Sequence, residues 1–513
     1  MRILLATAVL LTGCATGAGS AVARTDTADP AVVRTDRGAV RGTVTGDHRL
    51  FQGIRYATAG RWESPRPAPA WQGVKDATKP GAMCPQVGTD YADTRSEEED
   101  CLFLNVTTPG GTRPAAGARR PVMVWVHGDG AVGGGHFSDA RALADRGVVV
   151  VTINYRLGVF NGFGYPGLRD AGAYGLQDQQ EALRWVRRNA AAFGGDPGNV
   201  TLFGVSFGGL AVNAHLTAPA SKGLFHRAIL QSSPAMLDMP AGSMVPGLEA
   251  VESFGYRTQE EVTAMGRLFA PQLGCSDLAC LRALPVKKIL DVPQIMNAFQ
   301  VYAHGGATLP TRPDRALRAG RFHRVPVLAG ATKDEHRIFV GMNYNVQDKT
   351  PDYPALVRTA FGRRAPAVLR AYPVKAYGSP SLAWAAVLTD RMWARGTHEQ
   401  NTLLARHVPV YGYEFADRKA PMFLPFETDF DWGAYHAGDL PYLFPERKVR
   451  FTPAQRGLAD RMAGYWTNFA RTGDPNGAGL PAWPRVKDGT LSLAPDAVRP
   501  IDYAAEHRLG FWK

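Results

Sequence analysis

The chain of 513 residues has few cysteines, no long apolar segment and no repeated unit. None of its apolar runs reaches the roughly 18 consecutive residues that a membrane-spanning helix needs. Glycine and proline are frequent, at 56 and 37 residues, but they recur with no fixed period, which excludes solenoid and collagen-like architectures. Because hydrophobic residues make up 45% of the chain, it can bury a large core and is expected to be globular.

Basic residues outnumber acidic residues by 58 to 46, which gives a formal net charge of +12. The basic side chains are spread along the whole chain and form no basic run interleaved with aromatic residues. Proteins that bind nucleic acids concentrate positive charge on one face or along one stripe. The sequence therefore predicts no nucleic-acid partner.

The first residues have the pattern of an export signal. One basic residue, Arg2, precedes an apolar run at residues 3–11, which is too short to span a bilayer but typical of a signal peptide. Residues 11–14, LTGC, resemble the lipobox of bacterial lipoproteins, whereas residues 21–23, AVA, suit ordinary signal peptidase. We therefore expect a signal peptide at residues 1–23, or at 1–13 with Cys14 lipidated. In either case the protein would be exported, and it would contact membranes only through the lipid.

Five cysteines are present, and Cys14 would be cut away or consumed by lipid. The even number that remains favours disulfide bonds in an exported chain, Cys84 to Cys101 and Cys275 to Cys280, although four free thiols are the alternative. Cys-x-x-Cys pairs are absent, and no histidine lies at metal-ligand spacing from these cysteines. We therefore expect no metal site.

Short runs of β-branched residues alternate with stretches of helical periodicity, which predicts an α/β fold with a large, mostly parallel sheet flanked by helices. We expect strands at residues 121–126, 148–153, 200–203, 228–230, 325–328 and 408–415. Residues 175–192 carry apolar side chains at helical spacing with charged residues opposite, which predicts a helix.

Other segments have less regular patterns. Residues 34–56 suggest an initial antiparallel hairpin, and residues 245–322 suggest a helical, loop-rich lid or wall over the site. We expect residues 24–34 to be a flexible linker. Because no linker divides the remainder, residues 35–513 should form a single domain.

The sequence Gly-Val-Ser-Phe-Gly, centred on Ser206, follows a predicted strand and precedes a helical stretch. In that context Gly-x-Ser-x-Gly is typical of a nucleophile elbow, where glycines relieve the crowding around a strained serine. Without the strand, the same residues would indicate only a glycine-rich turn. The context therefore makes Ser206 a candidate nucleophile.

Four segments resemble the type-B carboxylesterases, a family of α/β-hydrolases that includes the cholinesterases. They are residues 193–206, FGGDPGNVTLFGVS; residues 99–106, EDCLFLNV; residues 154–158, NYRLG; and residues 465–475, YWTNFARTGDP. The resemblance extends from about residue 35 to the C-terminus. It implies the α/β-hydrolase fold and the hydrolysis of esters by a serine nucleophile.

The resemblance also implies the partners of Ser206. Residues 433–442, GAYHAGDLPY, look like the family's catalytic-histidine loop, with His436 as general base and Asp439 where glutamate is usual. Glu335 resembles the acid that orients the histidine, and the order Ser, Glu, His is typical of α/β-hydrolases. Ser232 resembles a serine that supports the acid by hydrogen bonding. The plain alternatives are a helix N-cap for Glu335, a loop residue for His436 and a turn residue for Ser232.

The oxyanion loop departs from the family pattern. Residues 127–131 are HGDGA where the family has His-Gly-Gly-Gly-Phe, and Phe207 follows the serine where a small residue is usual. The backbone N–H groups of Asp129, Gly130 and Phe207 remain the expected oxyanion donors. A carboxylate of Asp129 about 4 Å from the oxyanion would oppose it by roughly 4 kcal/mol at an effective dielectric constant near 20. Either this carboxylate points away, or catalysis is weakened.

The resemblance implies hydrolysis of a small neutral carboxylic ester, with no metal and no organic cofactor. Choline esters are disfavoured, because no tryptophan lies between Cys84 and Cys101 and Val205 stands where cholinesterases have glutamate. Two alternatives stay open: a catalytically weakened cell-surface binding protein of the same fold, and a lactonase or amidase with the same three residues. The sequence does not indicate the oligomeric state.

Overall fold

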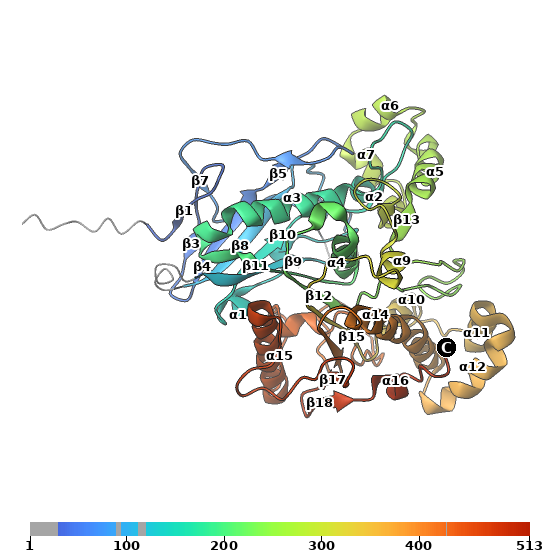
Figure 1. Ribbon diagram of the computed structural model, residues 1–513. Coiled ribbons are helices and arrows are strands. Elements are labelled where there is room, and N and C mark those ends of the chain that lie inside the picture. Colours follow the sequence, from blue (N-terminus) through green and yellow to red (C-terminus); the bar gives the residue numbers. More distant parts are fainter. Residues whose placement is uncertain (1–28, 89–93, 111–118, 427) are drawn as a thin grey trace, which may run out of the picture.

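The computed structural model describes residues 29–88, 94–110, 119–426 and 428–513 (Figure 1). The predicted signal peptide, with Cys14 and both candidate cleavage sites, lies outside the described residues. None of the helices in the described ranges combines the length and apolar character needed to cross a membrane.

The predicted α/β fold is confirmed: within the described ranges, an 11-stranded sheet runs through the protein in the order β18-β17-β16-β15-β12-β11-β9-β10-β8-β4-β3. Its strands are β3 (Thr43–Val44), β4 (His48–Arg55), β8 (Phe103–Pro109), β9 (Arg120–Val126), β10 (Val149–Ile153), β11 (Gly195–Val205), β12 (Arg227–Gln231), β15 (Val327–Thr332), β16 (Val410–Phe415), β17 (Thr490–Leu493) and β18 (Val498–Ile501). Pairing is parallel from β10 through β9, β11, β12, β15 and β16 to β17, and antiparallel at both edges.

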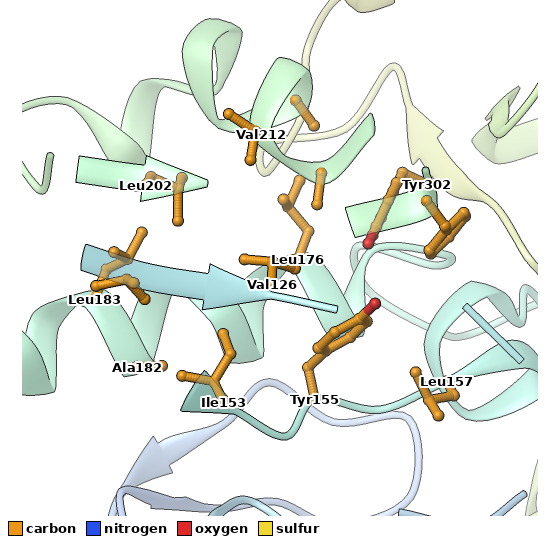
Figure 2. Close-up of a cluster of buried hydrophobic side chains, with 14 of the residues drawn as sticks. Val126, Ile153, Tyr155, Leu157, Leu176, Ala182, Leu183, Leu202, Val212 and Tyr302 are labelled. Atoms are coloured by element: carbon orange, nitrogen blue, oxygen red, sulfur yellow. The ribbon is translucent and has the colours of Figure 1, made fainter. Parts of the chain in front are cut away.

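All six predicted strands belong to this sheet, although β15 and β16 each begin two residues later than expected. Within β9, successive side chains point to opposite faces of the sheet. Val124 therefore joins one core cluster and Trp125 the other. Figure 2 shows part of the first cluster, where Val126 and Leu202 from the sheet face Leu176 and Val212 from the helices.

Helices cover both faces of the sheet (Figure 1). The cluster on the first face includes side chains of α3 (Tyr174–Asn189) and α4 (Phe207–Thr217), and the second includes side chains of α15 (Pro453–Thr472). Helix α3 is the helix predicted at residues 175–192, but its last predicted residues form a 3-10 turn, Ala190–Phe193.

The N-terminal region differs from the prediction of one hairpin. Strands β1 (Val32–Arg34) and β2 (Ala39–Arg41) form a hairpin that joins β7 (Val74–Asp76) in a separate small sheet. Strands β3 and β4 form a second hairpin at the edge of the large sheet. A tight turn closes each hairpin, and hydrogen bonds from the N–H groups of Thr35 and Thr45 hold the two turns. The segment therefore forms two hairpins where one was predicted. Strand β1 begins at Val32, within the last residues of the predicted linker.

The segment predicted as a helical, loop-rich wall has that character. It contains β13 (Tyr256–Thr258), α5 (Gln259–Phe269), α6 (Leu278–Ala283), α7 (Val286–Leu290), α8 (Ile295–Ala298), β14 (Tyr302–His304) and α9 (Pro313–Arg318). A second helical region follows β15, with α10 (Arg337–Asn343), α11 (Tyr353–Phe361), α12 (Ala365–Ala371), α13 (Pro380–Leu388) and α14 (Arg395–Ala405).

Two disulfide bonds are present, Cys84–Cys101 and Cys275–Cys280, with Cα–Cα distances of 4.8 and 5.6 Å. These are the two pairings expected from the sequence. The first bond ties residue 84 to the start of β8, and the second closes a small loop in the wall segment.

Candidate active site

Ser206 occupies the sharp turn between β11 and α4, with φ 54° and ψ −124°. Such a conformation costs a residue with a side chain about 1–3 kcal/mol, so the surroundings must hold it in place. The two flanking glycines make room for the turn. A Cβ atom at Gly204 would lie 2.7 Å from the backbone of Gly208, and one at Gly208 would lie 2.2 Å from the carbonyl oxygen of Val126.

Glu335 and His436 form a buried pair. The Nδ1 atom of His436 lies 2.5 Å from Oε2 of Glu335, a side chain with no exposed surface. The other oxygen, Oε1, accepts a hydrogen bond from the backbone N–H of Thr332 at 2.8 Å. Because the carboxylate requires a donor at Nδ1, the neutral imidazole carries its proton there and leaves Nε2 as the proton acceptor.

Ser206 and His436 line the same cavity, whose volume is about 610 Å³. The Nε2 atom of His436 is buried and has no hydrogen-bond partner among the described residues. The hydrogen bond from Ser206 Oγ to this nitrogen is therefore not formed in the structure. Such bonds are often long or misaligned in enzymes without substrate.

Two aromatic rings enclose His436. Its ring centre lies 4.8 Å from that of Trp393 and 5.2 Å from that of Phe339. Trp393 belongs to a π-helical segment, Thr389–Ala394, and donates its indole N–H to Nδ1 of His336 at 3.0 Å. Burial lowers the pKa of His336 to about 4, so this histidine stays neutral and accepts the bond.

Sequence reasoning missed both rings. Phe339 lies on α10, whereas Glu335 lies in the turn before this helix, so no helical spacing links the two residues in the sequence. Trp393 lies in the π-helical segment, which has no sequence signal of its own.

Ser232 has a positive φ of 49° and is fully buried. Its hydroxyl has no hydrogen-bond partner among the described residues. The bond expected from Ser232 to the acid is thus not formed, and Thr332 donates to Glu335 instead.

The carboxylate of Asp129 is turned onto its own loop. Its Oδ1 atom accepts hydrogen bonds from the N–H groups of Ala131 at 2.9 Å and Val132 at 3.1 Å. It also lies 3.4 Å from the side-chain amide nitrogen of Gln300, which comes from the wall segment. These three donors stabilise the negative charge on the loop side.

The expected oxyanion donors are not all available in this arrangement. The N–H of Gly130 donates to the carbonyl of Gly128 at 3.0 Å, across Asp129 with its φ of 67°. The N–H of Phe207 lies in the first turn of α4, where backbone N–H groups have no partner within the helix. The loop must therefore change if Gly130 is to serve as a donor.

The large side chain of Phe207 finds room against the wall segment. Its ring stacks on Tyr302, with centroids 4.5 Å apart and an interplanar angle of 18°. It also covers Gly130, where an added Cβ atom would lie 2.3 Å from the ring. A glycine at position 130 is thus a steric requirement of Phe207.

Asp439 lies behind the pair of Glu335 and His436. It is fully buried, and its Oδ2 atom accepts hydrogen bonds from Gln231 and Tyr413, both at 3.1 Å. Burial raises the pKa of Asp439 to about 6, since the charged form loses its hydration.

Apolar and aromatic side chains dominate the cavity wall. They are Trp125, Val132, Phe137, Val205, Phe207, Met244, Phe254, Ile338, Phe339, Met342, Trp393, Phe423, Leu424, Ala437, Leu440, Pro441 and Phe444. Among the described residues, the lining includes the carboxylates of Asp129 and Glu446 but no lysine or arginine. No group of three or more His, Cys, Asp or Glu residues in the described ranges is placed to hold a metal ion.

Comparison with known proteins agrees with this geometry. A model of the carboxylesterase family matches residues 29–512. Pyrethroid hydrolase Ces2a of Mus musculus is 32% identical, over 95% of this chain and 91% of that protein. Acylcarnitine hydrolase of Rattus norvegicus is 33% identical, over 92% of this chain and 88% of that protein. Para-nitrobenzyl esterase of Bacillus subtilis (strain 168) is 31% identical, over 90% and 93% respectively.

The family match spans nearly the whole chain, and the relatives exceed 30% identity over most of their own length. The large parallel sheet, the strained serine between β11 and α4, and the imidazole–carboxylate pair at one cavity fit the same fold. The chain belongs to the carboxylesterase family, the serine-dependent ester hydrolases of the α/β-hydrolase fold.

Proposed function

We propose that this carboxylic ester hydrolase uses Ser206 as nucleophile, His436 as general base and Glu335 as the acid that orients the base. The main support is the buried 2.5 Å contact between Glu335 and His436, which leaves Nε2 without a partner among the described residues beside the cavity that Ser206 lines. A hydrogen bond from the Ser206 hydroxyl to Nε2 would complete the arrangement.

The proposed reaction has two halves. The hydroxyl oxygen of Ser206 attacks the ester carbonyl while Nε2 of His436 takes its proton, and the proton then passes to the leaving alcohol as the C–O bond breaks. Water next attacks the acyl-enzyme by the same proton path and releases the acid. Glu335 stays ionised and stabilises the imidazolium that forms in each half.

The backbone N–H groups of Asp129, Gly130 and Phe207 are the proposed oxyanion donors. Phe207 begins α4, and the partial positive charge of a helix N-terminus favours a developing anion there. Gly130 must exchange its bond to Gly128 for one to the oxyanion.

Neutral carboxylic esters are the proposed substrate class. The cavity wall is mainly apolar, and the described lining has no cation to pair with a carboxylate on the substrate. The negative charges of Asp129 and Glu446 would repel such a group. Burial raises the pKa of Glu446, which reduces the repulsion that this residue contributes. Esters that carry an additional carboxylate should therefore react poorly.

Export is also proposed, with residues 1–23 or 1–13 as signal peptide and one catalytic domain after it. The two disulfide bonds support this proposal, because such bonds persist in oxidising compartments. Free secretion and lipidation at Cys14 are the two proposed outcomes of export.

The family match speaks against the alternative of a non-catalytic binding protein, and so does the presence of Ser206, His436 and Glu335. A lactonase or amidase would use the same three residues and differ in the shape of the pocket and the leaving group. Substrate panels decide between these chemistries.

The test is hydrolysis of a panel of nitrophenyl esters of increasing acyl length by the purified mature protein and two variants. Ser206→Ala should abolish turnover while leaving the fold intact. Ser253→Ala removes another buried hydroxyl that has no partner among the described residues, and it should retain turnover. Full activity of Ser206→Ala would refute the proposed nucleophile.

A further inference from the structure

The loop that carries the proposed oxyanion donors is fixed at its N-terminal end. It follows β9, and the carbonyl of His127, the first residue after that strand, accepts a hydrogen bond from the hydroxyl of Tyr155 at 2.7 Å. The loop then passes through Asp129 and Gly130 to a run of glycines at residues 133–135, two of which line the cavity. The placement of the donor N–H groups therefore also depends on what holds this glycine run.

Gln86 binds both backbone groups of Gly133. Its side-chain Oε1 accepts a hydrogen bond from the N–H of Gly133 at 2.7 Å, and its Nε2 donates to the carbonyl of the same residue at 3.2 Å. Gln86 is fully buried and does not belong to the described cavity lining. Because an unpaired polar group in the interior costs about 1–3 kcal/mol, this double contact holds Gly133 in one place and one orientation.

Gln86 is itself firmly placed. Its backbone N–H and carbonyl pair with those of Ser96 at 3.0 and 3.1 Å. It also lies two residues after Cys84, whose disulfide bond to Cys101 closes the segment. The anchor of the glycine run is therefore a cross-linked segment that lies outside the cavity lining at Gln86.

A second amide ties the glycine run to the same segment. The side-chain Oδ1 of Asn154 accepts a hydrogen bond from the N–H of Gly135 at 2.8 Å. Its Nδ2 donates to the carbonyl of Ala82 at 2.9 Å and to that of Cys101 at 3.2 Å. Both amides thus connect the loop to the two ends of the disulfide-closed segment.

The residues between the donors and the anchor form one bonded turn. The carboxylate of Asp129 accepts hydrogen bonds from the N–H groups of Ala131 and Val132, and Gly133 comes next in the chain. A displacement of Gly133 would therefore be transmitted to the N–H groups of Asp129 and Gly130. In a catalytic site, a displacement of about 1 Å can cost on the order of 10²-fold in rate.

We propose that Gln86 is a positioning residue, which holds the oxyanion loop at Gly133 so that the N–H groups of Asp129 and Gly130 can reach the oxyanion. The exchange that Gly130 must make takes place between two fixed ends of the loop, at His127 and Gly133. This inference rests on the proposed esterase function.

The experiment measures kcat and KM on dissolved para-nitrophenyl acetate for the wild-type chain and for Gln86→Met. Methionine has a similar length but lacks the amide, so both bonds to Gly133 are lost. We expect kcat to fall on the order of 10- to 100-fold with KM nearly unchanged, because the donors act mainly in the transition state. The inhibition constant of a trifluoromethyl ketone, whose adduct with Ser206 carries an oxyanion, should rise by about the factor by which kcat/KM falls.

A second variant separates positioning from stability. Gln86→Asn keeps an amide that is one methylene shorter, so it either loses Gly133 or displaces it. Its kcat should also fall at least about tenfold, although its free energy of unfolding in urea should fall less than that of Gln86→Met. If Gln86→Met does not fold, Gln86→Asn carries the test.

The matched control is Gln180→Met on α3. Gln180 is also buried, and its side-chain amide donates to Ser221 at 3.2 Å, but neither residue belongs to the described cavity lining. This variant should lose stability and keep the wild-type kcat. An equal loss of kcat in the control would overturn the proposal.

Unchanged kcat in the folded Gln86 variants would overturn the proposal, and so would a fall in kcat without weaker binding of the trifluoromethyl ketone. Failure of the proposed function has a different signature. A wild-type chain that hydrolyses no ester would refute the esterase function and, with it, any role of Gln86 in catalysis.

Discussion

Raising the pH, or replacing His507 by glutamine, should destabilise the protein by removing one buried imidazolium. His507 lies between two carboxylates, with Nδ1 2.6 Å from Asp390 and Nε2 2.5 Å from Glu414. It ties the C-terminal segment to β16 and to the π-helical segment that carries Trp393. The same contacts therefore support the packing around His436.

The size of the effect follows from the pKa of His507. Burial alone would lower this pKa, but the hydrogen bonds to Asp390 and Glu414 outweigh it and raise the pKa to about 9 from the ordinary 6.5. At about 1.4 kcal/mol per pH unit, the difference of roughly 2.5 units gives about 3 kcal/mol. Because the folded pKa is the higher one, this stability is fully present below about pH 6.5 and is lost as the pH rises through about 9.

The assay is urea unfolding of the wild-type chain and of His507→Gln between about pH 7 and pH 10. Over this range the wild-type chain should lose most of the stability that protonated His507 contributes. The free energies of unfolding of the two chains should therefore converge at high pH. His407→Gln, a change at an exposed histidine outside the cluster, serves as control. A constant difference between wild type and His507→Gln across the whole range would refute the reasoning.

Three further predictions concern the site. Glu335→Gln should lower kcat on a short-chain nitrophenyl ester on the order of 10⁴-fold, because the imidazole loses its orienting charge; retention of near-normal kcat would contradict the pairing. Asp129→Gly should not raise turnover, since the carboxylate already bonds to Ala131 and Val132; a clear gain would show that its charge does oppose the oxyanion. Trp393→Phe keeps a ring against His436 and should therefore retain kcat. It should lower the free energy of unfolding, measured in urea, by about 1 kcal/mol, because the hydrogen bond to His336 is lost. A collapse of kcat would assign the indole N–H a larger role.

The sequence predicted the features that depend on local patterns. β-branched runs became the central strands because a parallel sheet buried on both faces selects such residues. The elbow at Ser206 was predictable because a strained turn between strand and helix requires small neighbours at positions 204 and 208. The positions of Glu335 and His436 came from resemblance, and their contact spans 101 residues of sequence.

Other features depend on contacts that no local pattern encodes. The carboxylate of Asp129 was predicted either to point away or to hinder catalysis, and only the fold shows it bonded to its own loop. Phe207 fits because Tyr302, 95 residues later, offers a ring to stack on. Trp393, which packs against His436, lies in a π-helical segment that no local sequence pattern indicates.

The most direct test of the central claim is peptide mass spectrometry after reaction of the purified protein with a fluorophosphonate. The proposed mechanism predicts one added phosphonyl group per chain, located on Ser206. It also predicts labelling that slows sharply in His436→Gln, because the serine then lacks its base. Label on a different residue, or unchanged labelling of His436→Gln, would contradict the assignment of these side chains.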